Sequence, residues 1–169
     1  EYISKKFYVD HTESIIIAAE IENLDLTPYL VEVTPEERMK MELFRQNDDA
    51  RSLAHNALYD NDKAIDYLHG RGITDESIET YKIGYAPPLV DGKTIFDSMP
   101  NAGALKLYRK DQFNDAILFP ICDANGRMRY FQSRPFNPIT GMKYIGADDT
   151  HPLFDEVDRI FGFDVAKKN

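Results

Sequence analysis

Cationic and aromatic side chains are interleaved in the last third of this 169-residue sequence. Residues 127–134 contain Arg127, Arg129 and Arg134, set among the apolar and aromatic residues Met128, Tyr130 and Phe131. Lys143 and Tyr144 repeat the combination. Cations can hold phosphate groups and aromatic rings can stack on bases, so residues of these types could bind an anion that carries flat rings. The alternative is a solvated surface, in which Arg134 pairs with an acid elsewhere in the chain.

A β-hairpin is expected to support these cations, because residues 113–134 read FNDAILFPICDANGRMRYFQSR. The apolar run Ala116–Cys122 is separated from the cationic run by Asn125-Gly126, and both residues of such a pair tolerate the positive φ of a tight turn. Pro120 lacks an N–H. Its strand is therefore expected at a sheet edge, or the missing donor is expected to face away from the partner strand.

We find no catalytic or metal-binding motif in the sequence. The single cysteine, Cys122, excludes a disulfide framework and a Cys-rich zinc site, and its apolar surroundings predict a buried thiol rather than a nucleophile. Asp60-Asn61-Asp62 has an Asp-x-Asp pattern, but its place at a helix end favours capping over a metal site. Four histidines lack metal-ligand spacing and are expected at the surface or at helix ends: His11, His55, His69 and His151.

Charge is distributed unevenly along the chain. The net charge is −9, yet residues 105–145 carry 7 Lys and Arg against 3 Asp and Glu, whereas residues 1–66 carry 7 against 15. This division predicts an acidic half that faces solvent or a partner and a mildly basic half that could face an anion. The sequence has neither an apolar run long enough for a membrane span nor the pattern of a signal peptide, so we expect a cytoplasmic protein without a membrane partner.

The N-terminal part is expected to be helical. Thr34-Pro35-Glu36-Glu37 combines an N-cap, a proline at the first helical position and a capping-box glutamate. A helix should therefore run from Thr34 to Asp60, with a break near residues 47–49 as an alternative. Two short helices should follow, the first ended by Gly70 and Gly72 in left-handed conformations and the second capped by Thr74.

The rest of the chain is expected to combine strands with short helices. Residues 83–88 should be extended, residues 91–99 and 102–107 short helices, and residues 142–145 a short strand, while Asp164 should cap a last helix. The expected fold class is therefore α+β: a helical N-terminal region followed by a small mixed or antiparallel sheet built on the 116–134 hairpin.

Five motifs occur in a fixed order: AIDYLHGRGI at 64–73, IGYAP at 83–87, the 113–134 stretch, MKYI at 142–145, and Leu153-Phe154 followed by Ile160-Phe161-Gly162. They resemble the motifs YLxxRG, IGYAP, FRDRIMFPIxDxxGRVIGFGGR, PKYLNS and LF…LYG of DnaG-type bacterial primases. Residues 63–169 are thus similar to the N-terminal subdomain of the primase catalytic core, which precedes the metal-binding Toprim subdomain. Residues 1–62 lie outside the resemblance, as a helical extension or linker.

The resemblance implies template binding within a DNA primase, which synthesises RNA primers on single-stranded DNA during replication. In this family Mg²⁺ or Mn²⁺ is held by carboxylates of the Toprim subdomain, a cluster that we do not find here. We therefore expect no cofactor in this chain and no activity in isolation. The expected partners are single-stranded DNA and the Toprim subdomain of the same full-length protein, with a replicative helicase as a further candidate. Encoding by a phage or mobile element is an alternative to a chromosomal origin.

The resemblance also implies binding residues, because at the positions of Arg134 and Lys143 the family has a cation that contacts the template whatever its base sequence. The expected contacts are Arg134 and Lys143 as main cations, Arg127 and Arg129 as assisting cations, and Tyr130 and Tyr144 as stacking rings.

Several positions depart from the family pattern. Ala116 stands where the family has an arginine, and Glu156 stands near the position of a lysine. The glycines of GFGG are replaced by Tyr130, Gln132 and Ser133. With fewer cations and a net charge of −9, template binding is expected to be weak and strongly dependent on salt.

Two other functions are left open by the sequence. The first is a protein-interaction or regulatory module whose acidic helices, Thr34–Asp60, dock on a replication partner. The second is a small-molecule enzyme, which would require a deep pocket with grouped titratable residues.

Overall fold

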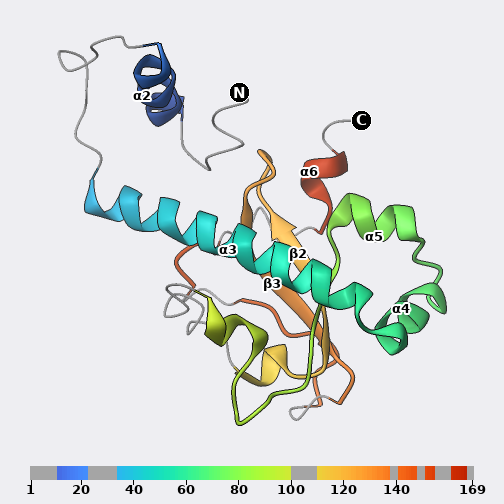
Figure 1. Cartoon of the computed structure of the whole chain (residues 1–169). Helices are drawn as coiled ribbons and strands as arrows, with labels where there is room; N and C mark the ends of the chain where they lie inside the picture. Colours follow the sequence, from blue (N-terminus) through green and yellow to red (C-terminus); the bar gives the residue numbers. More distant parts are fainter. Residues whose placement is uncertain are drawn as a thin grey trace.

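A computed structural model describes residues 11–22, 34–99, 110–137, 141–147, 151–154 and 161–166. Helices α2 (His11–Ile21), α3 (Pro35–Tyr59), α4 (Asp62–His69) and α5 (Asp75–Tyr81) come first. Strands β1 (Gly84–Ala86), β2 (Ala116–Cys122) and β3 (Met128–Pro135) follow, together with the short 3-10 helices η2 (Ile95–Ser98) and η4 (Lys110–Phe113) and helix α6 (Phe163–Ala166). This arrangement confirms the α+β fold class (Figure 1).

Helix α3 begins at the capping box that the sequence predicts. The Thr34 side chain accepts from the Glu37 amide at 3.2 Å, and the Glu37 carboxylate accepts from the Thr34 amide at 2.8 Å. The helix is continuous through residues 47–49, so the alternative of a break there is wrong. Asn47 remains helical because its side-chain amide is buried and donates to the Met128 and Arg129 carbonyls of β3.

Helices α4 and α5 both begin at side-chain caps, and the cap of α5, Thr74, is the one that the sequence predicts. Thr74 accepts from the Ser77 amide at 3.2 Å, and Asn61 accepts from the Ala64 amide at 2.9 Å. Asn61 therefore does cap a helix, but at the start of α4 rather than at the end of α3. Gly72 has a positive φ of 78° after α4. Gly70 is right-handed, with φ −62°, so only one of these two glycines supplies a left-handed position.

The sheet is antiparallel, with strand order β1-β2-β3. Ile117 of β2 pairs with Tyr85 of β1 on one side and Arg134 of β3 on the other. The strand expected at residues 142–145 is only an isolated bridge, in which Ser133 and Ile145 exchange backbone hydrogen bonds of 2.8 and 3.0 Å.

Pro120 lies in the central strand, so the expectation of an edge strand is wrong. The backbone N–H and C=O of Ser133 bond to Ile145 and therefore point away from β2. Leu118 lies opposite Ser133 on β2, so the N–H and C=O of Leu118 point away from β3 and toward β1. Pro120 lies two residues further and has the same orientation. Because β1 pairs only as far as Leu118, the missing donor of Pro120 faces away from β3, where no β1 residue requires it.

The hairpin turn is longer than a two-residue turn. Among the described residues, positive φ outside glycine occurs only at Lys82, Asp91 and Asp115, so Asn125 does not have the expected positive φ. Gly126 does, at 83°, and its amide donates to the Asp123 carbonyl at 2.9 Å. The buried Asp123 carboxylate accepts from the Asn125 and Arg127 amides, so the turn depends on this aspartate as well as on the glycine.

Hydrophobic clusters cover both faces of the sheet. Leu118 packs with Ala54 of α3 and with Phe96, Phe113 and Phe131, whereas Ile117 packs with a second group: Leu58, Leu68, Ile78, Ile83 and Tyr85. Neighbouring strand residues point to opposite faces, so helix α3 crosses one face and α4 and α5 cover part of the other (Figure 1). Among the described residues, no helix is sufficiently long and apolar to span a membrane.

Candidate functional site

The six side chains assigned from the sequence fall into two separate groups. Arg134, Lys143 and Tyr144 lie together near the C-terminal end of β3, where Ser133 is bridged to Ile145. We call these three residues the Arg134–Tyr144 patch. Arg127, Arg129 and Tyr130 instead face helix α3 and residues 151–154. The hairpin therefore does not present one continuous row of cations.

Arg134 lies beside an exposed aromatic ring. Its Cζ lies 5.8 Å from the centroid of the Tyr144 ring, and its Nη1 donates to the Pro135 carbonyl at 2.6 Å. Its Nε is buried and makes no hydrogen bond with any described residue. The Tyr144 side chain is 47% exposed, and Lys143 beside it is also exposed. A cation and an accessible ring are thus available at one place.

A buried amide fixes the segment that carries Tyr144. The Gln112 side chain donates to the carbonyls of Phe131 and Ile145, at 3.2 and 3.1 Å. Gln112 is 2% exposed, so these hydrogen bonds do not compete with water. Together with the Ser133–Ile145 bridge, they join the patch to β3.

Phe119 belongs beside this patch and was missed by the sequence reasoning. Its ring centroid lies 6.4 Å from that of Tyr144, and Phe161 lies on its other side at 5.3 Å. Phe119 is two residues from Ile117, the partner of Arg134, so strand alternation places both on the face that carries Arg134. The alternation of side chains along a β-strand, visible in the sequence, could have identified Phe119.

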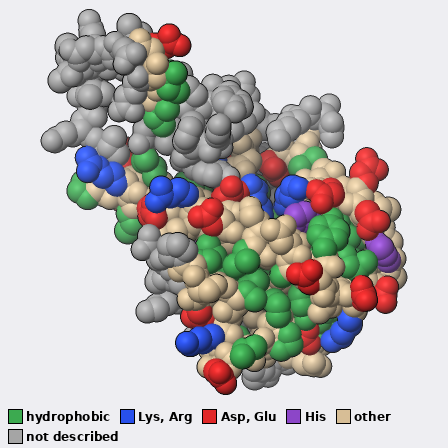
Figure 2. All heavy atoms as spheres, in the orientation of Figure 1, with side chains coloured by type: hydrophobic (Ala, Val, Ile, Leu, Met, Phe, Trp, Pro, Cys, Tyr) green, Lys and Arg blue, Asp and Glu red, His purple; other side chains and the backbone are tan. Residues whose placement is uncertain are grey.

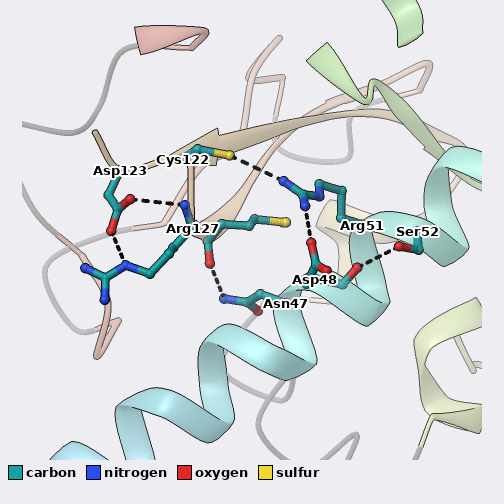
Figure 3. Close-up of polar contacts among 8 residues, drawn as sticks. Asn47, Asp48, Arg51, Ser52, Cys122, Asp123 and Arg127 are labelled. Carbon is teal, nitrogen blue, oxygen red and sulfur yellow. Dashed lines mark hydrogen bonds and ion pairs between the residues drawn. The ribbon is translucent and has the colours of Figure 1, made fainter. Parts of the chain in front are cut away.

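Arg127 is engaged by an acid of the hairpin turn. Its Nε donates to the Asp123 carboxylate at 2.7 Å, and its guanidinium lies 4.7 Å from the centroid of the Phe44 ring. Figure 3 shows this pair at the end of the hairpin, where Asn47 of α3 contacts the adjoining strand. Helix α3 therefore positions the turn through Asn47 and contacts the Arg127 guanidinium through the Phe44 ring.

Arg129 and Tyr130 are also engaged within the fold. Arg129 donates from Nη1 to the Leu153 carbonyl at 3.0 Å and, with Arg127, lines a groove of about 390 Å³ between α3 and residues 152–154. Tyr130 is only 4% exposed and packs on Phe154 and His151. The expectation that Tyr130 offers a stacking surface does not hold, because its ring is covered.

The Cys122 thiol is buried, as the sequence predicts. Burial raises its pKa to about 12, although the Arg51 guanidinium donates to the sulfur at 3.8 Å (Figure 3). Arg51 is itself paired with Asp48 one turn earlier in α3. A thiol with this pKa is a weak nucleophile at neutral pH.

Three histidines contact neighbouring residues in the described structure, and the side chain of His11 lies outside the described part. His55 was expected at the surface or at a helix end but is 7% exposed, and its Nδ1 donates to the Ile83 carbonyl at 2.8 Å. His151 is also buried and accepts from the Leu153 amide at 3.1 Å, while His69 is exposed beside Asp75. Among the described residues, no three His, Cys, Asp or Glu side chains are grouped so that they could hold a metal ion.

Charge on the face that carries α3 is mixed. Figure 2 shows acidic and basic side chains dispersed among hydrophobic ones there, without a continuous basic field over the described residues. On this face, the described residues therefore offer an anion particular cations rather than a broad positive surface.

Residues 53–167 match the family described as DNA primase catalytic core, N-terminal domain. The chain belongs to this family. The match begins inside helix α3, and the division of the chain at residue 62 stays a prediction. A primase core therefore accounts for both the sheet and the last turns of the long helix.

The similar proteins are longer than this chain. The DNA primase of Enterococcus faecalis is 29% identical over 185 residues, which covers 95% of this chain and 29% of that protein. The primase of Treponema pallidum is 32% identical over 116 residues, covering 62% of this chain and 18% of that protein. The chain thus spans less than a third of the length of these two relatives.

Solved primase structures share the fold. A DNA primase domain from Pseudomonas aeruginosa is 25% identical with a TM-score of 0.60, over 75% of this chain and 44% of that one. A DnaG primase catalytic domain bound to single-stranded DNA has a TM-score of 0.61 at 24% identity, over 78% of this chain and 47% of that one. At that identity the second similarity concerns the fold alone.

Proposed function

We propose that this chain is the template-binding part of a DNA primase and holds single-stranded DNA through the Arg134–Tyr144 patch. The observation that carries the proposal is the Arg134 guanidinium, which is fixed on a strand beside the exposed Tyr144 ring and has a buried Nε without a hydrogen-bond partner among the described residues. Membership of the primase core family supports it, as does the similarity in fold to a primase domain bound to single-stranded DNA.

The patch offers two kinds of contact to a single strand. Arg134 and Lys143 can bind phosphates of any sequence, and the Tyr144 ring can stack on a base. Because β3 and the Ser133–Ile145 bridge fix the backbone of the patch, little conformational entropy is lost there on binding. Recognition of this kind holds a template without selecting its sequence.

Primer synthesis requires further parts of the protein. Nucleotide transfer by such enzymes uses Mg²⁺ or Mn²⁺ held by grouped carboxylates, which align the attacking and leaving oxygens. We place these metals in the Toprim subdomain of the same full-length protein, with this chain presenting the template to it, and keep a replicative helicase as a candidate partner. A separate protein-interaction module is not favoured, because the similar proteins are DNA primases.

Salt-titrated binding tests the proposal. The 169-residue chain is added to a fluorescently labelled single strand and anisotropy is followed at several salt concentrations. We expect weak binding whose logarithmic affinity falls linearly with the logarithm of salt concentration, because each phosphate contact releases counterions. Absence of binding at low salt, or binding that does not respond to salt, would contradict a template-holding role.

A further inference from the structure

A row of aromatic rings continues from Tyr144 across the open part of the sheet. The Tyr144 and Phe119 centroids are 6.4 Å apart with planes tilted by 48°. Phe161 meets Phe119 at 5.3 Å and 79°, and Tyr81 of α5 lies 5.1 Å beyond Phe161. Four separate segments of the chain therefore contribute to one row.

Phe119 is partly accessible in an otherwise buried strand. All seven residues of β2 are described, and Phe119 is the only one that is not buried. Ile117 and Ile121, which flank it at the same spacing, are 0% and 1% exposed. Burial of a phenylalanine side chain is favourable, so a partly exposed ring here leaves part of that free energy available to a ligand.

The more distant rings hold Phe119 in place. Phe161 packs against it at nearly a right angle, which fixes the orientation of the Phe119 ring. Gly162, which has a φ of 77°, follows Phe161 and lies close to Tyr81. This approach requires glycine, because a Cβ there would lie 2.7 Å from the Tyr81 ring. Phe119 is thus supported by Phe161, which contacts Tyr81 in turn, while Tyr144 and Phe119 both remain partly exposed.

We infer that Tyr144 and Phe119 form a stacking platform for unpaired bases of single-stranded DNA. This inference rests on the proposed function and adds to it the part of the ligand that the rings contact. Arg134 and Lys143 lie at the Tyr144 end, where they meet phosphates of the same strand. Duplex DNA does not fit, because its base faces are already stacked on one another, so the platform selects single strands.

Paired oligonucleotides separate the bases from the phosphates. One strand is an oligo-dT, and the other has the same length and phosphate count with abasic sites in a central run. The parent chain should bind the intact strand at least about fivefold more tightly, which corresponds to the lower end of the free energy of stacking one base. Equal affinities for the two strands would overturn the platform while leaving template binding intact.

Substitutions locate the effect. Tyr144→Leu should narrow the difference in affinity between the intact and the abasic strand, and Tyr144→Phe should restore it. Phe119→Leu should give the same pattern, and thermal unfolding identifies any loss of folding in it. A Tyr144→Leu variant that keeps the difference would overturn the platform, whereas a parent chain that binds neither strand would contradict the proposed function itself.

Discussion

The three arginines of the hairpin lie in different environments. Arg127 donates to the Asp123 carboxylate and Arg129 to the Leu153 carbonyl, whereas Arg134 donates to the adjacent Pro135 carbonyl and contacts an exposed ring. A cation already paired with a carboxylate gains less from a phosphate, because the new interaction must replace the existing one. Arg134 and the exposed Lys143 are therefore the cations on which template binding should depend most.

Replacing Arg134 and Lys143 by Ala should weaken binding of single strands of any sequence to a similar extent. The slope of logarithmic affinity against logarithmic salt should flatten by about one for each phosphate that the variant no longer binds. Arg45→Ala is the matched control, because its side chain is 66% exposed on α3 and its ion pair among the described residues is with Glu42 of the same helix. Unchanged affinity and slope in the double variant would place the template path elsewhere.

Cys122 should resist a thiol reagent in the native protein. Its side chain is 6% exposed and its pKa is raised to about 12, so both access and thiolate formation are suppressed at neutral pH. Labelling should become fast when denaturant unfolds the chain. Since this is the single cysteine, the total signal reports one site. Rapid labelling of the folded protein would show that β2 is exposed at this residue.

At the scale of elements, helix α3 organises the sheet. It approaches β1 so closely that a Cβ on Gly84 would lie 2.7 Å from the Ala54 Cβ and 2.9 Å from the Ala54 backbone carbon. Its Asn47 amide contacts the backbone of β3 on the opposite edge of the sheet. One helix thus sets the positions of both outer strands.

Gly84→Ala should destabilise the fold by roughly 1 to 3 kcal/mol, the usual cost of overpacking a tight contact. Gly146→Ala is the matched control, because a Cβ there meets no atom within 4 Å. It should change the free energy of unfolding by less than about 0.5 kcal/mol. Chemical denaturation of both variants measures the difference, and equal stabilities would mean that α3 does not pack directly on β1.

Glu79 connects α5 with the end of α3. Its carboxylate accepts from Lys82 at 2.6 Å and from Tyr59 at 2.9 Å, and lies 3.1 Å from Nε2 of His55. Hydrogen bonds from Lys82, Tyr59 and His55, in that order, lower the pKa of Glu79 to about 2. The ionised carboxylate therefore stabilises the folded state relative to the unfolded state.

This stabilisation should depend on pH in one direction. It is present above the ordinary pKa of a glutamate, about 4.3, and is lost as pH falls toward the lowered pKa of the folded state. As pH falls between those values, the melting temperature of the parent should decrease more steeply than that of Glu79→Gln, which lacks the titrating group. Parallel curves for the two proteins would show that the Glu79 contacts do not contribute.

At the scale of the whole molecule, the family match and the packing have different boundaries. The match begins at residue 53, yet Leu43, Phe44, Asn47 and Ala50 are buried before it. Leu43 and Phe44 pack with Leu153, far along the chain. Residues from Thr34 onward are therefore expected to contribute to the stability of the primase core.

Truncation tests that expectation. A chain of residues 53–169 should be less stable than one of residues 34–169 by more than about 2 kcal/mol, because it lacks buried leucine and phenylalanine side chains and the hydrogen bonds from Asn47 to β3. Thermal and denaturant unfolding of the two chains provides the comparison. Equal stability would support a division after the first part of α3.

Local sequence determined the helix starts and the existence of the hairpin. The caps at Thr34, Asn61 and Thr74 each join atoms three residues apart, so both partners are visible in one short pattern. Gly126 similarly meets the requirement of a turn for positive φ. Such interactions form largely independently of the rest of the fold, which explains why the sequence predicts them well.

Only the tertiary structure decided which side chains are available for binding. Asn47 remains helical because its amide meets carbonyls 81 and 82 residues away, and Tyr130 is covered by residues 151–154. Pro120 is accommodated in a central strand because β1 pairs with β2 only as far as Leu118 and does not extend beside Pro120. Each outcome depends on which segments far apart in the chain meet, and residue types and spacing contain little information on such contacts.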